Sequence, residues 1–241
     1  MFRIVDKAQF SDKVYKFVVE APRVAKARRP GHFVIVRSGI TGERIPLTIA
    51  DADTASGTIT LVIQAVGAST ERICALNPGD VFDDLVGPLG RATDIALRGT
   101  VVCCGGGVGV APMLPIAKAM KEAGNKVISV IAARTSDLVI LENEVFKCSD
   151  ELIVMTDDGS YGKKGFVTDG VEAVLLREKV DEVVAIGPAI MMKYVSELTR
   201  RYSVPTICSL NTIMVDGTGM CGACRVTVGG KTRFVCVDGP E

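Results

Sequence analysis

Three cysteines and one aspartate lie close together near the C-terminal end of the sequence, in a glycine-rich segment. Cys221 and Cys224 form a C-x2-C pair, and eleven residues separate Cys224 from Cys236. Plant-type 2Fe-2S proteins use the spacing C-x4-C-x2-C followed by a distant cysteine. Asp216 stands where the first of those cysteines would be, with four residues between it and Cys221. The spacing therefore predicts a 2Fe-2S cluster held by Asp216, Cys221, Cys224 and Cys236.

An aspartate ligand would change the properties of such a cluster. A carboxylate is a harder donor than a thiolate, so it is expected to alter the reduction potential relative to an all-cysteine site. Gly217, Gly219 and Gly222 would let the backbone wrap closely and aim N–H groups at the sulfur atoms. A structural zinc ion with three cysteines and one aspartate fits the same spacing and remains the alternative.

A second candidate site is a glycine loop in the middle of the chain. Gly105, Gly106, Gly107 and Gly109 follow the apolar run TVVCC and precede a helical pattern, MLPIAKAMKEAG. Such a loop lets the backbone approach a pyrophosphate at a helix N-terminus. The next predicted strand, KVISVIAA, ends at Arg134 instead of the acidic residue that usually holds the ribose of NAD. Arg134 could contact a 2′-phosphate or the adenosine ribose, or be a solvated strand-end residue, so NADH and NADPH both stay open.

The elements that must position these residues fall into three parts. Residues 1–98 show short alternating runs separated by turns, which is typical of a small antiparallel barrel. Residues 99–205 alternate strand and helix patterns, which predicts a doubly wound parallel sheet. Residues 206–241 form a segment too small to fold without a bound metal or another cross-link, which we call a staple. The predicted fold class is α/β with a β-barrel, followed by a small C-terminal cluster segment.

Composition excludes some classes of function. Lys+Arg and Asp+Glu are both 28 in 241 residues and no long basic run occurs, which argues against nucleic acid as a partner. The N-terminal residues lack an apolar core of the signal-peptide type, so we expect a cytoplasmic protein. Eight cysteines in that compartment favour metal binding for the clustered ones. We expect the other five to be buried structural thiols: Cys74, Cys103, Cys104, Cys148 and Cys208.

Several motifs together resemble the ferredoxin-NADP reductase superfamily. They are RIPLT at 44–48, QAVGAST at 64–70, GPLG at 87–90, GGGVGVAP at 105–112 and TDDGSYGKKG at 156–165. The cysteine-rich tail is similar to that of small subunits of two-subunit flavoproteins. One such group is the electron-transfer subunits of dihydroorotate dehydrogenase, and the other is the small subunits of NADH-dependent reduced ferredoxin:NADP oxidoreductase, also known as sulfide dehydrogenase. The likeness covers nearly the whole chain, and an aspartate as first ligand resembles the second group.

The resemblance implies an FAD site in the barrel and a nicotinamide site in the α/β part. Its implied cofactor-binding residues are Pro46, Leu47 and Thr48 lining the flavin, Gln64, Ala65 and Val66 beside its ring, Gly67, Ser69 and Thr70 at its pyrophosphate, and Asp158, Gly187 and Pro188 at the nucleotide. Family members usually place a flavin-binding arginine three residues before the Ser/Thr. Here that position is Ile45, and the arginine is the preceding residue, Arg44.

The resemblance also implies a mechanism and a partner. Hydride would pass between NAD(H) or NADP(H) and FAD, electrons would pass singly to the 2Fe-2S cluster, and no catalytic acid or base is needed. The partner would be a larger glutamate-synthase-like iron-sulfur flavoprotein, docked near the C-terminal segment, in a complex that bifurcates electrons with ferredoxin and NADP. The alternatives are a subunit for NAD-dependent dihydroorotate oxidation, a sulfide or polysulfide reductase, and a regulatory subunit with a zinc staple.

Overall fold

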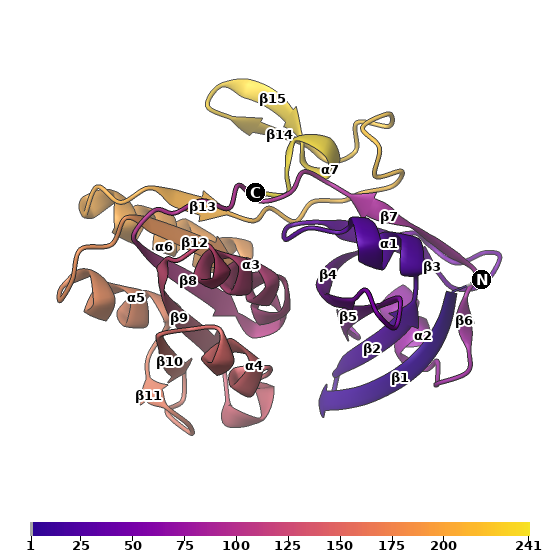
Figure 1. Cartoon of the computed structure of the whole chain (residues 1–241), viewed down its shortest axis with the longest axis horizontal. Coiled ribbons are helices and arrows are strands. Elements are labelled where there is room, and N and C mark those ends of the chain that lie inside the picture. Colours follow the sequence, from indigo (N-terminus) through magenta and orange to yellow (C-terminus); the bar gives the residue numbers. More distant parts are fainter. Residues whose placement is uncertain (1) are drawn as a thin grey trace. The chain divides into compact units, whose positions relative to one another are not determined.

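The computed structural model describes residues 2–241 (Figure 1). By its internal contacts the chain divides into two compact units. The first contains the residues up to Thr93 together with Leu210–Glu241, and the second is Asp94–Ser209. The C-terminal segment therefore belongs with the N-terminal part of the chain, and the boundaries placed after residues 98 and 205 stay predictions.

The first unit is built on a seven-stranded antiparallel sheet with the order β6-β1-β2-β5-β4-β3-β7. Its strands are β1 (Phe2–Ser11), β2 (Val14–Glu20), β3 (Phe33–Arg37), β4 (Ile45–Asp53), β5 (Thr58–Gln64), β6 (Val81–Phe82) and β7 (Asp84–Leu89). Only Asp83 separates the two edge strands β6 and β7 along the chain. The sheet must therefore curl until its edges approach each other, and the antiparallel barrel is confirmed.

Side-chain alternation along β3 gives this strand two buried faces. Val34 and Val36 are fully buried in the barrel interior. Phe33 and Ile35 point to the opposite face, as period-two alternation requires, and belong to a separate apolar cluster. Two short helices complete this part of the unit, α1 (Pro22–Ala27) and α2 (Ala68–Cys74), and both contact β5.

The C-terminal segment packs on the outer face of β3. It consists of an extended loop, a hairpin of β14 (Arg225–Val228) and β15 (Lys231–Phe234), and the single-turn helix α7 (Val235–Asp238). Its buried residues Cys224, Val235 and Cys236 form one cluster with Phe33 and Ile35 of the barrel. The segment thus shares an apolar core with β3.

The second unit is a parallel six-stranded sheet with the order β11-β10-β9-β8-β12-β13. Its strands are β8 (Thr100–Gly106), β9 (Lys126–Ala133), β10 (Glu151–Thr156), β11 (Lys163–Lys164), β12 (Glu182–Ile186) and β13 (Thr206–Cys208). Its helices are η1 (Gly107–Gly109), α3 (Val110–Glu122), η2 (Ser136–Leu138), α4 (Glu142–Lys147), α5 (Val167–Leu175) and α6 (Ala189–Arg201). Helices α5 and α6 pack on the face that carries Val102 and Val130. The doubly wound sheet is confirmed.

The strand order fixes where a ligand would bind in this unit. From β8 the chain proceeds to β9 on one side, and later places β12 on the other side of β8. In open α/β sheets, ligands bind outside the carboxyl ends of the strands at such a reversal. The glycine loop follows β8, and Gly187 follows β12. Both therefore lie at the sheet edge where such a ligand is expected.

Within residues 2–241, no helix combines the length and the apolar character needed to cross a membrane. The long uncharged stretch that begins near residue 99 instead folds as β8, η1 and the start of α3. Its glycines and prolines account for this, because they interrupt what would otherwise be a single apolar run.

Candidate functional site

The four predicted metal ligands lie in two pairs. The Sγ atoms of Cys224 and Cys236 are 3.2 Å apart, too far for a disulfide bond, and both residues are buried. Sγ of Cys221 lies 3.2 Å from Oδ1 of Asp216. Burial raises the pKa of the Cys236 thiol, and both the Cys224 thiol and the Asp216 carboxylate raise this pKa further. The Asp216 carboxylate of one pair therefore acts electrostatically on Cys236 of the other pair.

This arrangement bears on the kind of metal. Within the described residues 2–241, no three or more His, Cys, Asp or Glu side chains converge as a single ion would require. A structural zinc ion takes four donors around one centre. A cluster of two irons takes its protein donors two per iron. The Asp216–Cys221 and Cys224–Cys236 pairs match this arrangement of two protein donors per iron.

Hydrogen bonds hold the Asp216 carboxylate in place. It accepts from the backbone N–H groups of Thr218 at 3.2 Å, Met220 at 3.0 Å and Cys221 at 3.1 Å, and from the Thr218 hydroxyl at 3.0 Å. Burial alone would raise the pKa of this carboxyl, but the bonds from the Cys221 thiol and from Thr218 outweigh it and hold the pKa well below its usual range. Asp216 therefore stays ionised, as a metal ligand must. Thr218 was not predicted, although an aspartate two residues before a threonine is a common local turn.

The loop that carries Asp216 is seated on the barrel at two points. Gly217 has a φ of +76°, and a Cβ added there would lie 2.5 Å from Cδ1 of Ile35 and 2.9 Å from Cδ1 of Leu89. Only glycine fits so close to β3 and β7 in this conformation. The second point is Arg44, whose guanidinium donates to the carbonyl oxygens of Val215 and Asp216.

The predicted flavin residues of β4 share a surface with the cluster segment. In the β3–β4 ladder, Pro46 lies opposite Ile35 and Thr48 lies opposite Phe33. Because directly opposed residues of an antiparallel pair point to the same face, Pro46 and Thr48 belong to the outer face of the sheet, on which the cluster segment packs. Leu47 points the other way and packs against the barrel interior.

The second group of predicted flavin residues spans the end of β5 and the first turn of α2: Gln64, Ala65, Val66, Gly67, Ser69 and Thr70. The Thr70 hydroxyl accepts hydrogen bonds from the N–H of Val66 at 2.9 Å and of Gly67 at 3.1 Å, so it fixes the loop. The Ser69 hydroxyl donates to the Glu43 carboxylate, next to Arg44. The structure thus brings the β5–α2 loop close to the start of β4, which carries the first group of predicted flavin residues. Glu43 was not predicted from the sequence. A shallow hollow lies at this junction, lined by Ser38, Gly42, Glu43, Ser69, Arg72 and Ile73.

The glycine loop of the second unit packs closely against the turn after β12. A Cβ added to Gly109 would lie 2.4 Å from the carbonyl oxygen of Ile186 and 2.7 Å from Cα of Gly187. Gly105 and Gly106 are buried, whereas the Cβ position of Gly107 faces open space. The loop and the turn that contains Gly187 and Pro188 therefore meet at the sheet's reversal point, and the half-buried Gly107 has open space at its Cβ position.

Arg134 and Asp158 are brought together at the carboxyl edge of the sheet, and both are exposed. The backbone N–H of Asp158 donates to the carbonyl oxygen of Arg134 at 3.3 Å. Ser160 joins the two segments, since its hydroxyl donates to Asp158 at 2.7 Å and accepts from the N–H of Ser136 at 2.9 Å. Hydrogen bonds from Ser160 lower the pKa of the Asp158 carboxyl. Ser136 and Ser160 were not predicted from the sequence.

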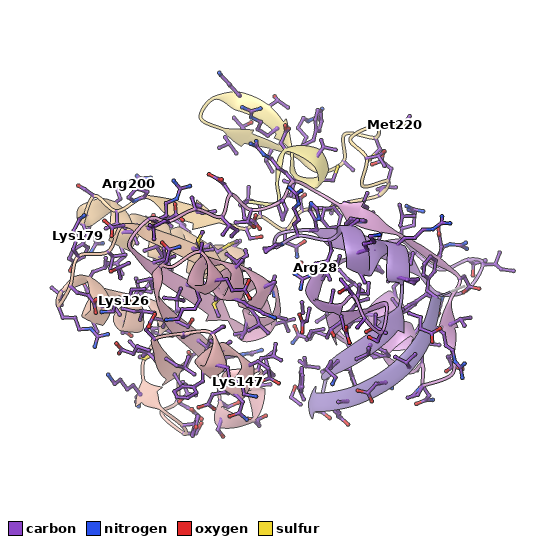
Figure 2. The ribbon with its side chains drawn as sticks, viewed as in Figure 1. Arg28, Lys126, Lys147, Lys179, Arg200 and Met220 are labelled. Carbon is purple, nitrogen blue, oxygen red and sulfur yellow. The ribbon has the colours of Figure 1, made fainter. Side chains whose placement is uncertain are left out.

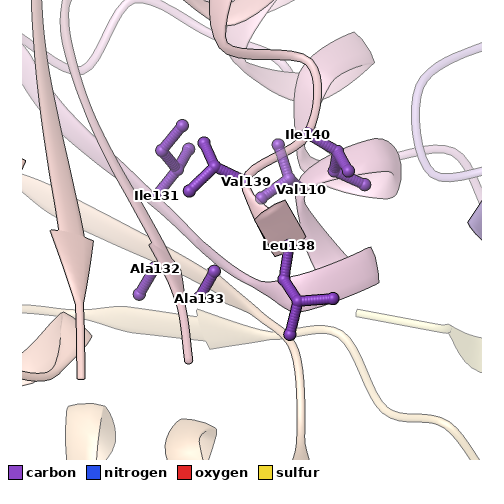
Figure 3. Close-up of a pocket in the computed structure, with 7 residues that line it drawn as sticks. All are labelled: Val110, Ile131, Ala132, Ala133, Leu138, Val139 and Ile140. Carbon is purple, nitrogen blue, oxygen red and sulfur yellow. The ribbon is translucent and has the colours of Figure 1, made fainter. Parts of the chain in front are cut away.

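An apolar hollow lies beside β9 (Figure 3). It is lined by Val110, Ile131, Ala132, Ala133, Leu138, Val139 and Ile140. These side chains offer no hydrogen-bond donor or acceptor, whereas a nucleotide site needs polar groups to orient its ligand. We interpret this hollow as a packing seam between β9 and the segment before α4.

Family models match both the cluster segment and the nucleotide unit. Residues 211–241 match the iron-sulfur cluster binding domain of dihydroorotate dehydrogenase B. Residues 103–197 match the oxidoreductase NAD-binding domain. The first match covers all four predicted metal ligands, and the second covers the glycine loop, Arg134, Asp158 and the turn after β12.

Relatives cover almost the whole chain. The dihydroorotate dehydrogenase B (NAD(+)) electron transfer subunit homolog of Thermotoga maritima is 49% identical over 238 residues, which is 99% of this chain and 84% of the relative. The dihydroorotate dehydrogenase B (NAD(+)) electron transfer subunit of Fusobacterium nucleatum is 32% identical over 247 residues, 98% of this chain and 93% of the relative. The chain belongs to this family of electron transfer subunits. It is an oxidoreductase subunit that works with a partner subunit and a nicotinamide nucleotide.

Solved structures agree with membership of the family. The structure of NADH-dependent reduced ferredoxin-NADP oxidoreductase, studied for flavin-based electron bifurcation, matches with a TM-score of 0.96 and 47% identity, over 100% of this chain and 87% of that chain. The cytochrome b5 reductase domain of Ulva prolifera nitrate reductase matches with a TM-score of 0.70 at 19% identity, over 86% of this chain and 95% of that chain, and shows the shared fold alone. The cofactors of this electron transfer subunit are FAD, an iron-sulfur cluster and a nicotinamide nucleotide.

Proposed function

We propose that this chain is the small subunit of an electron-bifurcating complex that exchanges electrons between NAD(H) or NADP(H), ferredoxin and a larger flavoprotein. The observation that carries the proposal is the mixed ligand set, in which an ionised, hydrogen-bonded Asp216 pairs with Cys221 beside the Cys224–Cys236 pair. The similarity to NADH-dependent reduced ferredoxin-NADP oxidoreductase over 100% of the chain supports the same reading.

In this proposal each cofactor has its own group of residues. Asp216 and Cys221 hold one iron of a 2Fe-2S cluster, and Cys224 and Cys236 hold the other. The residues of β4 and of the β5–α2 loop described above bind FAD. The glycine loop binds the nucleotide pyrophosphate, Arg134 and Asp158 lie toward the adenosine end, and Gly187 and Pro188 lie toward the nicotinamide.

The chain's own residues position groups and do not transfer protons. FAD, when bound, supplies the conversion between two-electron hydride transfer and the one-electron chemistry of the cluster. Thr70 fixes the loop that would face the flavin phosphates, and the open space beside Gly107 would admit the nucleotide. Strand β3 links the two redox groups, because one of its faces supports the cluster segment while its ladder partners are the flavin residues Thr48 and Pro46.

The partner docks on the cluster segment in this proposal. Five large apolar side chains of the segment are exposed: Ile213 at 79%, Val215 at 51%, Met220 at 89%, Val228 at 53% and Val237 at 44%. Val215 and Met220 flank the ligands Asp216 and Cys221 in sequence, and Figure 2 shows Met220 in the loop of the cluster segment. Grouped exposed apolar side chains mark interaction surfaces. We assign this surface to a larger, glutamate-synthase-like iron-sulfur flavoprotein.

A second candidate is the electron-transfer subunit of an NAD-dependent dihydroorotate dehydrogenase. It is favoured by the names of the relatives and by the family match of residues 211–241. The large chain that copurifies with this subunit separates the two functions, because a dihydroorotate-oxidising subunit and a glutamate-synthase-like flavoprotein have unrelated sequences. Reduction of NADP with reduced ferredoxin and NADH, without any dihydroorotate-dependent activity, is the outcome expected of the bifurcating complex.

The decisive experiment is spectroscopy of the complex purified without oxygen, with Asp216→Cys as the comparison variant. We expect FAD, no zinc, and about two irons per small subunit in addition to the iron bound by the larger subunit. NADH should bleach the flavin and produce the EPR signal of a reduced 2Fe-2S cluster. In Asp216→Cys the cluster should persist with changed g values and a lower reduction potential, because thiolate replaces carboxylate. Zinc without an EPR signal, or a signal unaffected by the substitution, would refute the ligand assignment.

A further inference from the structure

Arg44 connects the strand of the flavin residues to the loop of the cluster ligands. It immediately precedes β4, two residues before Pro46. Its Nε atom donates to the carbonyl oxygen of Val215 at 3.0 Å, and Nη2 donates to the carbonyl oxygen of Asp216 at 3.5 Å. Nη1 completes the set with a bond of 3.3 Å to the carboxylate of Asp84, the first residue of β7. These partners belong to the cluster segment and to β7, not to the β5–α2 loop.

The guanidinium acts on the backbone at the ligand itself. The Asp216 carboxylate is ordered by hydrogen bonds within its own loop, from Thr218, Met220 and Cys221. Those bonds fix the shape of the loop but not its position on the barrel. Gly217 provides close packing against Ile35 and Leu89, which is not directional. The three donors of Arg44 are directional, because a guanidinium is a rigid planar fork.

The charge of Arg44 would also act on the cluster. An arginine side chain remains protonated in proteins, and that of Arg44 is only 33% exposed, so solvent screens it incompletely. A 2Fe-2S cluster gains one negative charge on reduction, so a nearby cation favours the reduced form. Asp84 offsets part of this effect, but it is bonded to Nη1, whereas Nε and Nη2 are bonded to the ligand loop.

We propose that Arg44 is a positioning residue for the iron-sulfur cluster. It fastens the Asp216 ligand to the strand that carries the flavin residues, and its charge raises the reduction potential of the cluster. The inference rests on the proposed function in one respect, namely that the segment holds a 2Fe-2S cluster. It replaces the contact with the flavin phosphates that the family resemblance suggests for an arginine in this region.

The test compares Arg44→Met and Arg44→Lys with wild type in the complete complex. Arg37→Met serves as a matched control, because the Arg37 guanidinium also donates to loop carbonyls, those of Gly39 and Ile40, outside the cluster segment. The measurements are FAD and iron content, EPR g values and an EPR-monitored redox titration. In Arg44→Met we expect unchanged FAD, shifted g values and an approximately tenfold lower ratio of reduced to oxidised cluster at a fixed potential, equivalent to about 59 mV for a one-electron couple.

Arg44→Lys separates charge from geometry. A lysine retains the positive charge, but its ammonium cannot span two carbonyls and a carboxylate as the planar fork does. We therefore expect most of the potential to be restored while the g values remain shifted. Arg44→Lys also tests the positioning role if Arg44→Met loses its iron. A wild-type reduction potential together with wild-type g values in Arg44→Lys would overturn that role.

The remaining outcomes separate this inference from the function on which it rests. Loss of FAD from Arg44→Met, with an unchanged cluster signal and potential, would make Arg44 a flavin ligand and overturn the inference. An equal change in Arg37→Met would show that any barrel arginine has the effect, and would overturn it as well. Absence of a 2Fe-2S signal from wild type would instead refute the proposed function.

Discussion

The nucleotide unit and the cluster segment hold their functional residues in different ways. The glycine loop extends from a sheet whose strands are buried on both faces, with Val102 and Cys103 both inaccessible to solvent on successive positions of β8. The cluster segment has a two-stranded hairpin and one helical turn, and its apolar residues pack on Phe33 and Ile35 of the barrel. One site is positioned by a core of its own, and the other by a core that it shares.

This difference predicts where each site is sensitive. A buried parallel sheet positions its loops through packing, independently of ligand. A small segment with little core depends on hydrogen bonds and on its metal for order, because binding energy is then also folding energy. Ligand loss should therefore disorder the cluster segment and leave the nucleotide unit unchanged, while changes in the core of the nucleotide unit should leave the cluster intact.

The largest expected effect follows from Cys224→Ser. This change removes one member of the buried Cys224–Cys236 pair and, with the proposed ligand set, would leave one iron with a single thiolate. We expect nearly complete loss of the cluster, measured as iron content and EPR signal. Hydrogen exchange should become fast throughout residues 210–241 and remain unchanged in residues 94–209.

Cys208→Ser is the control for this prediction. Cys208 is a half-buried thiol of β13, in the nucleotide unit, and is not one of the proposed ligands. It should retain the full iron content. If Cys224→Ser kept its iron, or if exchange rose equally in both units, the proposed dependence of the segment on its cluster would be wrong.

The second effect should appear only in the nucleotide unit, in Asn125→Ala. The Asn125 side chain is buried and fully bonded: Oδ1 accepts from the N–H of Arg98 and Gly99, and Nδ2 donates to the carbonyl oxygens of Ala96 and Met120. Removing it leaves backbone groups unpaired, so the free energy of unfolding of this unit should fall by about 3 kcal/mol.

Thermal or urea unfolding of Asn125→Ala, beside the exposed substitution Asn143→Ala, measures this loss. The iron content and EPR signal should match wild type at temperatures below the transition. A destabilisation no larger than that of Asn143→Ala would show that water replaces the lost bonds. Loss of the cluster would show that the two units are coupled more strongly than their separate cores suggest.

The sequence predicted those features that depend on local spacing and periodicity. The interval between Asp216 and Cys221 indicated a ligand set, and the structure does bring their side chains together. Alternation of apolar residues gave the barrel, and the change of pattern after residue 99 gave the parallel sheet. The individual flavin, nucleotide and metal assignments stay predictions until cofactor-loaded protein is measured.

Long-range polar contacts could not be predicted in this way. Arg44 and Val215 are 171 positions apart, and no local pattern relates them. The bond between Ser69 and Glu43 joins two loops whose approach depends on how the barrel closes. Strand β3 reads as a continuous apolar run, which indicates burial on both faces but does not say that the second face is covered by the C-terminal segment. These features arise from the assembled sheet.

Gly217→Ala tests whether close packing of the cluster segment on the barrel stabilises the segment. The added methyl group would collide with Ile35 and Leu89 in a backbone conformation that already disfavours side chains. Gly229→Ala is a matched control, because Gly229 also has a positive φ, of +58°, but has nothing within 4 Å of its Cβ position. We expect Gly217→Ala to destabilise the packing of the cluster segment on the barrel by about 2 kcal/mol. Gly229→Ala should destabilise it by about 1 kcal/mol.

Hydrogen exchange of residues 210–241 and the rate of iron release to a chelator measure this difference. Both should be faster in Gly217→Ala than in Gly229→Ala. Equal rates would mean that only backbone strain matters at these positions, and that the close packing of the ligand loop on the barrel contributes nothing.

The smallest expected effect is a pH dependence confined to the nucleotide unit. The Glu182 carboxyl, at the start of β12, is mostly buried; its Oε1 atom has no hydrogen-bond partner, and its Oε2 atom lies 3.6 Å from Nε of Arg98. Burial raises the pKa of Glu182 above its usual value, Arg98 opposes the shift, and Asp94 adds to it. Because the folded pKa exceeds the unfolded one, this group contributes stability below its ordinary pKa and loses that contribution as pH rises through the folded pKa.

Glu182→Gln cannot ionise, so it should escape this loss. The difference in Tm, variant minus wild type, should therefore increase between about pH 4 and pH 7. This increase should be smaller than the fall in Tm caused by Asn125→Ala. The exposed substitution Glu144→Gln on α4 should show no such trend. A difference that decreases with rising pH would mean that attraction to Arg98 outweighs burial, and the nucleotide unit would then gain stability from this ion pair despite its long separation.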